Sequence, residues 1–490
     1  MNATPPIKAL ADAAEPRVDS SQLKSVFLSG TSVDSIVFAL VDSFERRTWP
    51  IGSRFPSIRE FARHYGVSRY AVVEAFDRLV AMGYLEARRG AGFFAVYAPG
   101  EARAETPSRS SVSRSSSDPV EFTRALLQDE SGALKVGAPW LPESWIDAEY
   151  VQTAVRAVSR RPGSLFLQHG HPMGYGPLRI QIGRVADALD IPAQASDVLL
   201  CTGSSQAIDL IARHLLKPGD TVLVDDPGCF HICNYLRWFG VRLVPIPRHV
   251  NGPDVEALEV AARAHRPKAY FTQTVLQNPT GSTTSAQALI RILALARACD
   301  FQIVEDDRNA DFESLPATRL AALDGLERVI YVRSFSMTLP GSFRVGYVIA
   351  SDQIIDALIR IKLRLSVSSS QFSEMVLHHL LLDGHYRKFV DRLRTRTALA
   401  RSATLDQFDA LGLEVFCRPR DGHFLWARVP GCEDSTECIA LAERHNVMLA
   451  TGEPFRPAPG TSPWMRFNVA YCQDARLQAF LTDARSVHSS

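Results

Sequence analysis

The sequence lacks paired cysteines, long apolar runs and a recognisable leader. Its eight cysteines include no CxxC pair, and none has the spacing to histidine that is typical of a metal site. The apolar stretch over residues 375–382 is interrupted by His378 and His379 and is too short to span a bilayer. The first 20 residues have no basic start followed by an apolar core. We therefore expect a reduced, cytoplasmic protein with no membrane span.

A large excess of charge of either sign is also missing. The net charge is +1 at pH 7, which excludes a globally basic nucleic-acid coat, so any DNA contact must come from a local patch. With 490 residues, of which 46% are hydrophobic, the chain can bury about two or three separate cores.

The clearest boundary is a polar stretch over residues 98–119. It is rich in Ser, Pro, Arg and Glu and has almost nothing apolar to bury, which predicts a flexible linker. It separates an N-terminal unit, residues 21–97, from a large unit, residues 120–490. We expect residues 1–20 to be disordered.

The N-terminal unit has three helical segments. Apolar residues follow helical spacing over residues 34–44. Ser57 and Glu60 form a capping box that starts a second helix, and Gly66 suits its end. Ser68 is the expected N-cap of a third helix. Two helices joined by so short a turn predict a helix-turn-helix.

After this helix-turn-helix, residues 84–96 alternate and turn at glycines, which predicts a β-hairpin wing. The mildly basic segment RFPSIREFARHYGVSRYAVVEAFDRLVAMGYLEARRGAGFF closely resembles the GntR-type DNA-binding domain. The alternative is a winged helix that binds protein. The resemblance implies double-stranded DNA as partner. Its implied contacts are Arg59, Ser68, Arg69 and Tyr70 in the major groove, and Arg89 and Gly90 of the wing near the minor groove.

The large unit alternates strand-like and helix-like segments. The strand-like segments are DVLLC, TVLVD, KAYFTQ, FQIVED and RVIYVRSF, with amphipathic stretches between them. This pattern predicts an α/β unit with a mainly parallel sheet covered by helices. Ligands of such sheets bind at the carboxyl ends of the strands.

Five motifs at these ends resemble fold-type-I aminotransferases, which use pyridoxal 5'-phosphate (PLP). Together with the GntR-type segment they resemble the MocR subfamily of bacterial regulators. The resemblance implies a smaller C-terminal lobe over about residues 367–487 and a homodimer. It also implies cofactor contacts from Ser204 and Ser205 in TGSSQAIDL, Asn278 in QNPTG, Asp306 in VEDD, and Ser334, Ser336 and Arg344 in SFSMTLPGSFR. Arg466 in WMRFNVA matches the arginine that binds a substrate carboxylate.

Three positions depart from that pattern. Met337 stands where the family has the lysine that bonds the cofactor, and a thioether has no amine for this chemistry. Arg308 stands where a tyrosine contacts the 3-oxygen. It can either pair with that oxygen or neutralise Asp306. Cys229 stands where an aromatic ring stacks on the cofactor, and the adjacent Phe230 is the candidate substitute.

We therefore predict a DNA-binding transcription regulator, without catalysis, that senses a small amine or amino acid effector. PLP, its amine form PMP, or a PLP–amino acid adduct is expected to bind non-covalently. An active aminotransferase is the first alternative. It needs an acid-base lysine worth about 100-fold to 10,000-fold in rate, and neither Lys268 nor Lys362 is an obvious substitute. The second alternative is a dimerisation module that binds nothing.

Overall fold

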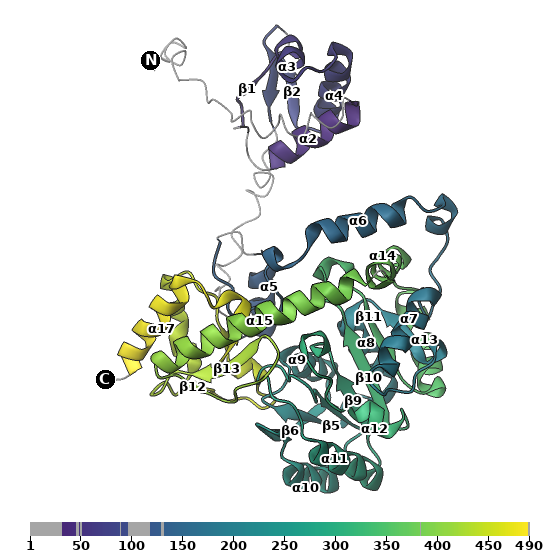
Figure 1. Cartoon of the computed structure of the whole chain (residues 1–490), viewed down its shortest axis with the longest axis vertical. Helices are drawn as coiled ribbons and strands as arrows, with labels where there is room; N and C mark the ends of the chain where they lie inside the picture. Colours follow the sequence, from purple (N-terminus) through teal and green to yellow (C-terminus); the bar gives the residue numbers. More distant parts are fainter. Residues whose placement is uncertain are drawn as a thin grey trace, which may run out of the picture. The chain divides into compact units, whose positions relative to one another are not determined.

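The computed structural model describes residues 32–45, 49, 51–88, 90–96, 118–128, 132–382 and 384–488. The chain divides into two compact units, Met1–Ser111 and Val112–Ser490, each with its own hydrophobic core (Figure 1). The division falls within the predicted linker, of which only Asp118 and Pro119 are described. Residues 1–20 lie outside the described part of the chain.

The N-terminal unit has the three predicted helices and the predicted hairpin. A short strand not expected from the sequence joins the hairpin, so the sheet has the antiparallel order β1-β3-β2. Two residues are too few to show an alternating pattern, which is why this strand was not predicted. The elements are α2 (Val33–Glu45), β1 (Arg54–Phe55), α3 (Ile58–Tyr65), α4 (Arg69–Ala81), β2 (Leu85–Arg88) and β3 (Gly92–Ala95).

Local capping fixes the helix-turn-helix as expected. Ser57 Oγ accepts a hydrogen bond from Glu60 N at 3.3 Å, and the Glu60 carboxylate accepts one from Ser57 N at 2.9 Å. Gly66 ends α3 with a left-handed φ of 66°. Ser68 Oγ then caps α4 by accepting from Ala71 N at 3.1 Å.

An eight-stranded sheet forms the centre of the large unit. Its order is β4-β11-β10-β9-β8-β5-β6-β7, and the pairs among β10, β9, β8, β5 and β6 are parallel, whereas β4, β11 and β7 pair antiparallel. All five predicted strands are present, and β6, β7 and β11 are additional. The strands are β4 (Val198–Cys201), β5 (Thr221–Asp226), β6 (Arg242–His249), β7 (Gly252–Pro253), β8 (Ala269–Thr272), β9 (Gln302–Asp306), β10 (Val329–Ser334) and β11 (Gly346–Ile349).

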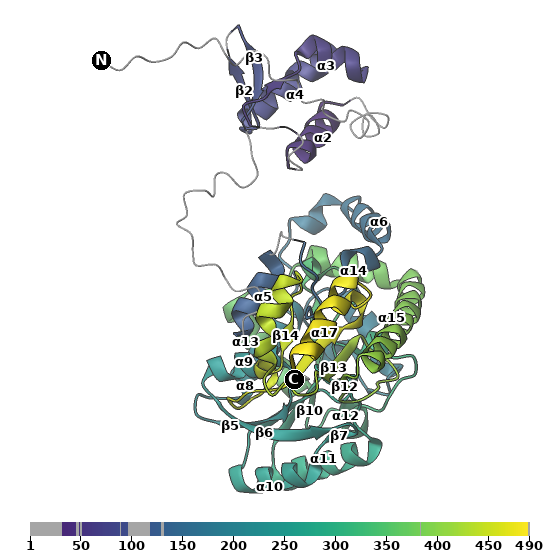
Figure 2. The same cartoon turned by 90° about the vertical axis from the view of Figure 1, so that its left-hand side faces the viewer.

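Helices cover both faces of this sheet (Figures 1 and 2). One apolar core lies under α8, α9 and α13, and the other under α7, α10, α11, α12 and α14. These helices are α7 (Gly176–Asp187), α8 (Gly203–Leu215), α9 (Phe230–Phe239), α10 (Val255–His265), α11 (Ala286–Cys299), α12 (Leu320–Asp324), α13 (Asp352–Leu365) and α14 (Gln371–Leu382).

A smaller lobe is built on an antiparallel sheet of order β12-β13-β15-β14. The described part of the large unit begins with α5 and α6, and α15 runs from the core of the large lobe to the core of the small lobe (Figure 1). The remaining elements of the large unit, in both lobes, are α5 (Pro119–Gln128), α6 (Ala148–Ser159), α15 (His385–Ala410), β12 (Glu414–Val415), β13 (Phe424–Arg428), α16 (Ile439–Arg444), β14 (Ala450–Thr451), β15 (Trp464–Asn468) and α17 (Ala475–His488).

The small lobe differs in extent from the predicted residues 367–487. The apolar residues of α14, such as Met375 and Leu380, belong to the core of the large lobe. Leu134 and Val136, far earlier in the chain, pack in the core of the small lobe, where Leu134 bridges Val447. Apolar spacing marks a buried helix face but not the core that receives it, so the sequence could not assign these segments. Among the described residues, no helix is long and apolar enough to cross a membrane.

Candidate functional site

The candidate side chains gather at the carboxyl ends of parallel strands. Asp306 ends β9 and Ser334 ends β10, while Cys229 and Asn278 lie in the segments after β5 and β8. Because these strands are parallel neighbours, their ends meet at one edge of the sheet.

Asp306 is 1% exposed and lies at the centre of this edge. Its Oδ2 accepts hydrogen bonds from Gln273 Nε2 and Arg308 Nε, both at 2.7 Å. Burial raises the pKa of Asp306, and the charge of Arg308 opposes that rise. Arg308 thus pairs with Asp306, which was the second of its two expected roles. The other carboxylate oxygen, Oδ1, is buried and has no hydrogen-bond partner among the described residues.

Asn278 connects this aspartate to a buried arginine. Its backbone N donates to Gln273 Oε1 at 2.9 Å, and its side-chain Oδ1 accepts from Arg466 NH1 at 2.8 Å. Asn278 Nδ2 lies 3.8 Å from the sulfur of Cys229. Gln273 therefore orients both Asp306 and Asn278.

Arg466 on β15 is fully buried, and among the described residues no carboxylate pairs with it. Its NH2 donates to the carbonyl of Gly137 at 2.6 Å, while Nε has no partner in the described structure. The rings of Phe424, Phe455 and Phe230 surround the guanidinium, with centroids 4.7, 5.0 and 5.6 Å from Cζ. Burial lowers the pKa of Arg466 to about 9, so the group is still cationic at neutral pH.

This aromatic cage also fixes the orientation of Phe230. Its ring packs edge-on against Phe455 with centroids 5.4 Å apart. Phe230 thus lies beside the buried arginine, whereas Cys229 is the residue against Asn278. A buried cation without an acidic partner is costly, and a ligand carboxylate would supply that partner.

A second cationic region lies at the N-terminus of α8. Gly203 there has a φ of 75°, and a Cβ at this position would lie 2.6 Å from NH2 of Arg344. Only glycine lets this guanidinium approach the helix end. Ser204 is buried in the first turn, and Ser205 Oγ lies 2.9 Å from His231 Nε2. Amide groups at a helix N-terminus favour anions.

The charges around Arg344 also favour an anionic ligand. Among the described residues, no acid pairs with this arginine. His231 is exposed at the surface, but the protein packed around its ring and the positive charges of Arg308 and Arg344 lower its pKa to about 4. Arg344 itself is exposed, so this end of the site presents a positive charge with which a phosphate would pair.

The segment with Met337 follows β10. Ser334 Oγ lies 3.0 Å from Ser336 Oγ and accepts from Ser336 N at 3.2 Å. Met337 is half-buried against the core of the large lobe. Its neighbour Thr338 is within 2.7 Å of the Tyr386 hydroxyl.

No lysine occurs between Lys268 and Lys362, a stretch that includes β8 to β11. Lys362 is buried on α13, and its Nζ donates to the carbonyls of Pro172 at 2.8 Å and Leu200 at 2.7 Å. It also donates to Ser369 Oγ at 3.1 Å. The amine of Lys362 is thus engaged by two backbone carbonyls and a serine hydroxyl.

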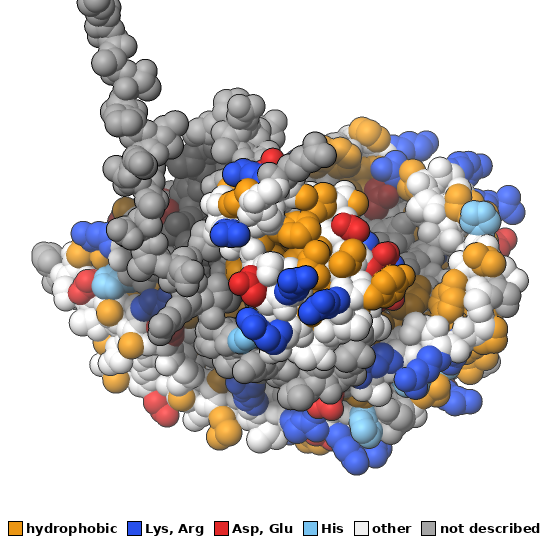
Figure 3. All heavy atoms as spheres, turned by 90° about the horizontal axis from the view of Figure 1, so that it is seen from above, with side chains coloured by type: hydrophobic (Ala, Val, Ile, Leu, Met, Phe, Trp, Pro, Cys, Tyr) orange, Lys and Arg blue, Asp and Glu red, His pale blue; other side chains and the backbone are white. Residues whose placement is uncertain are grey.

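In the N-terminal unit, Arg59, Arg69 and Tyr70 are exposed, Tyr70 by 78%. The Ser68 hydroxyl caps α4, and Gly90 turns the hairpin with a φ of 78°. Arg89 lies outside the described residues. Figure 3 views this unit from above and shows arginine side chains beside hydrophobic ones; its described residues include no lysine.

Sequence reasoning missed Gln273, His231 and two of the rings around Arg466, those of Phe424 and Phe455. Gln273 ends the motif KAYFTQ and is only five positions before Asn278, so its proximity to the site was available. Phe424 and Phe455 are separated from Phe230 by about 200 positions, and no local pattern indicates that contact.

Residues 178–483 match the model of the aminotransferase class I and II family. The chain belongs to this family. Residues 33–95 match the gntR family of bacterial regulatory proteins, so the chain joins a GntR helix-turn-helix unit to a fold-type-I aminotransferase fold.

Relatives include both regulators and enzymes. The chain is 25% identical over 452 residues to the uncharacterized HTH-type transcriptional regulator YdfD of Bacillus subtilis, covering 90% of this chain and 93% of the relative. It is 28% identical to the probable rhizopine catabolism regulatory protein MocR of Rhizobium meliloti, with coverages of 77% and 80%. It is 29% identical to a 2-aminoadipate transaminase of Thermus thermophilus, with coverages of 67% and 83%.

Solved structures support the fold of the large unit. A Pyrococcus horikoshii kynurenine aminotransferase in complex with PMP superposes with a TM-score of 0.69 at 25% identity, covering 75% of this chain and 94% of the other. LysN, an α-aminoadipate aminotransferase from Thermus thermophilus complexed with N-(5'-phosphopyridoxyl)-L-leucine, gives 0.69 at 25% identity, with coverages of 76% and 96%.

Proposed function

We propose that this protein is a transcription regulator whose aminotransferase-like unit binds a pyridoxal-type phosphate ester non-covalently and does not turn it over. The observation that carries the proposal is the pair of arginines without acidic partners among the described residues. Arg344 lies at a helix N-terminus that suits a phosphate, and Arg466 is buried where it suits a carboxylate. A ligand with both anionic groups fits best, which favours a PLP–amino acid adduct over PLP alone.

The residues between the two arginines fit the pyridine ring. The unpartnered Oδ1 of Asp306 can accept a hydrogen bond from a protonated ring nitrogen. Among the described residues, Asn278 Nδ2 has only the weak sulfur acceptor of Cys229, so it can donate to a ring oxygen. When bound, PLP supplies an aldehyde and an electron-withdrawing ring. Met337, in the position of the family's lysine, has no amine to react with that aldehyde.

The site has a direct packing route to the linker side of the unit. Phe122 and Leu126 of α5 belong to the same apolar cluster as Phe230 and Phe455, which contact Arg466. We infer that a carboxylate at Arg466 shifts this cluster and α5, and so changes the DNA affinity of the N-terminal unit. A homodimer with two such units would bind paired half-sites.

Ligand binding tests the proposal directly. The full chain is titrated calorimetrically with PLP, with PMP and with N-(5'-phosphopyridoxyl)-L-leucine as a stable adduct. We expect saturable binding, tightest for the adduct, and no borohydride-trapped bond between PLP and the site. Failure of all three ligands to bind would refute effector binding, while sequence-preferring DNA binding would still support a regulator.

The alternative is an active aminotransferase, which is favoured by the identity to transaminases. We assay amino-group transfer from amino acids to 2-oxo acids with added PLP, using matched PLP-free reactions. Turnover that depends on the protein would overturn the non-catalytic proposal.

A further inference from the structure

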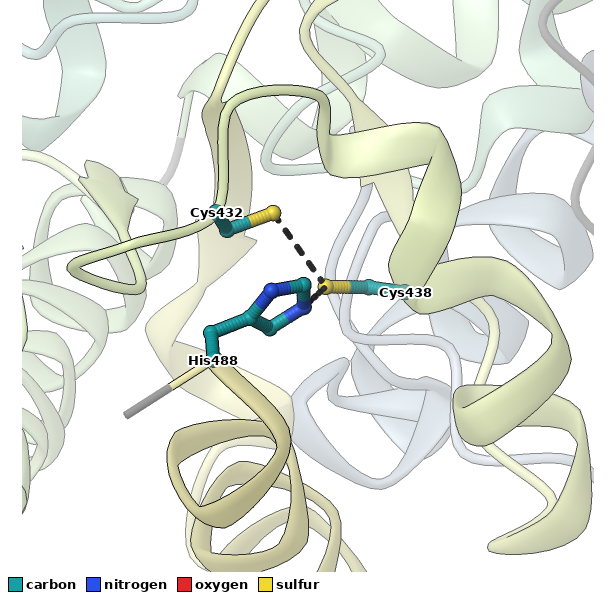
Figure 4. A group of neighbouring side chains, drawn as sticks. All are labelled: Cys432, Cys438 and His488. Atoms are coloured by element: carbon teal, nitrogen blue, oxygen red, sulfur yellow. Dashed lines mark hydrogen bonds between the residues drawn. The ribbon is translucent and has the colours of Figure 1, made fainter. Parts of the chain in front are cut away.

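Three metal-ligating side chains, none of which belongs to the five cofactor motifs, converge in the small lobe. Cys432 lies in the turn after β13, Cys438 ends the short helix Ser435–Cys438, and His488 ends α17. Figure 4 shows the two thiols and the imidazole pointing toward one another. The sulfur atoms are 3.8 Å apart, and Cys438 Sγ lies 4.0 Å from His488 Nε2. All three ligand atoms lie within 4.8 Å of one another.

These separations match a tetrahedral zinc site. Zinc–sulfur bonds of about 2.3 Å place two thiolates of a tetrahedron about 3.8 Å apart. With a zinc–nitrogen bond of about 2.0 Å, the sulfur–nitrogen edge is about 3.5 Å. The sulfur–sulfur distance already agrees, whereas the imidazole must move closer to both sulfur atoms to complete the site. A disulfide, by contrast, needs sulfur atoms at about 2.05 Å.

The surrounding backbone holds this arrangement. Gly431 has a φ of 85°, and a Cβ there would lie 2.2 Å from the carbonyl oxygen of His488. Glycine at 431 therefore lets the end of α17 approach the turn that carries Cys432. The short helix before Cys438 is capped by Asp434, whose Oδ1 accepts from Thr436 N at 3.0 Å.

The environment also suits a cation with one open position. Both cysteines are buried, whereas His488 is half-exposed, so water can reach a fourth coordination position. Zinc binds thiolate rather than thiol sulfur, so a bound zinc ion would displace the protons of both thiols. Thiolate and imidazole ligands favour zinc over the hard cations magnesium and calcium.

We propose that Cys432, Cys438 and His488 bind one zinc ion, with water as fourth ligand, and that the ion ties α17 to the small lobe. This function is independent of the cofactor site.

Metal retention by the full chain tests the proposal. Protein purified with reductant is stripped with a chelator, reloaded with Zn²⁺, desalted and analysed by mass spectrometry for metal per chain. We expect one zinc per chain and at least tenfold weaker binding in His488→Gln, whose half-exposed position spares the fold. Cobalt loading should add a thiolate charge-transfer band that Cys438→Ser loses.

His445→Gln is the matched control, because His445 also contacts α17, through Asp483 at 2.9 Å, without facing the thiols. This variant should retain zinc like the parent protein. Equal retention by the parent and His488→Gln, no retained zinc, or a Cys432–Cys438 disulfide in the reduced preparation would each overturn the proposal.

Discussion

At the scale of single residues, the proposal of a site that binds ligand without catalysis depends most on Met337. We expect Met337→Lys to restore the missing amine and to form a borohydride-reducible bond with PLP, detected as a phosphopyridoxyl group on residue 337 by peptide mass spectrometry. Met82→Lys is the control, because Met82 is exposed in the N-terminal unit. Labelling of residue 337 no stronger than that of residue 82 would mean that Met337 does not face the cofactor.

Arg466 should discriminate ligands that have a carboxylate. Removing one partner of a buried charged pair costs about 2–5 kcal/mol, so Arg466→Met should weaken phosphopyridoxyl-leucine binding by roughly 30-fold or more. PLP, which has no carboxylate, should bind almost unchanged. Calorimetric titration of both ligands separates these outcomes, and an equal loss for both would place the carboxylate elsewhere.

The pKa of His231 should change when a phosphate binds near Arg344. Its pKa is lowered to about 4, so the unfolded chain binds more protons between about pH 6.5 and pH 4, and this residue's contribution to stability is lost as pH falls through that range. A phosphate beside Arg344 should raise the pKa toward its ordinary value. The pKa of His231 is measured by NMR titration of the imidazole signals with and without PLP. The signal of His231 is assigned as the one that the His231→Gln variant lacks. No shift with saturating PLP would contradict a phosphate at α8.

At the scale of elements, the sequence predicted the strands and helix caps that depend only on residues close together in the chain. The strands β5, β8, β9 and β10 are short runs of buried apolar residues, and the capping box at Ser57 is fully local. By contrast, β6 contains Pro245 and Pro247, which obscure the strand pattern. The hydrogen bond between Asn278 and Arg466 spans 188 positions and depends on the tertiary fold.

The two ends of α4 should contribute differently to DNA binding. Arg69 is exposed at the helix N-terminus, whereas Arg78 near the other end pairs with Asp34 at 2.8 Å and Glu74 at 3.3 Å. We expect Arg69→Ala to weaken DNA binding by about 1–3 kcal/mol if it contacts a base, while Arg78→Ala has little effect. Fluorescence anisotropy with selected operator DNA at several salt concentrations tests this. Equal losses would indicate a general charge effect.

At the scale of the whole molecule, we propose that α5 couples ligand binding to DNA binding. Phe122 is 4% exposed and packs in the cluster around Phe230 and Phe455. We expect Phe122→Ala to preserve most ligand affinity but to reduce the ligand-dependent change in operator affinity. The exposed Leu127→Ala on the same helix is the control. An unchanged ligand response in Phe122→Ala would exclude this route.

With a non-covalently held ligand, as we propose, the lysine-free stretch between Lys268 and Lys362 would also affect how quickly the bound state is reversed. A ligand held only by hydrogen bonds and ion pairs leaves in a single dissociation step, without waiting for a bond to hydrolyse. Occupancy would then follow the supply of ligand in the cell on the timescale of its release. Such a regulator would return rapidly to its unliganded state when ligand is removed, because no covalent bond prolongs the bound state.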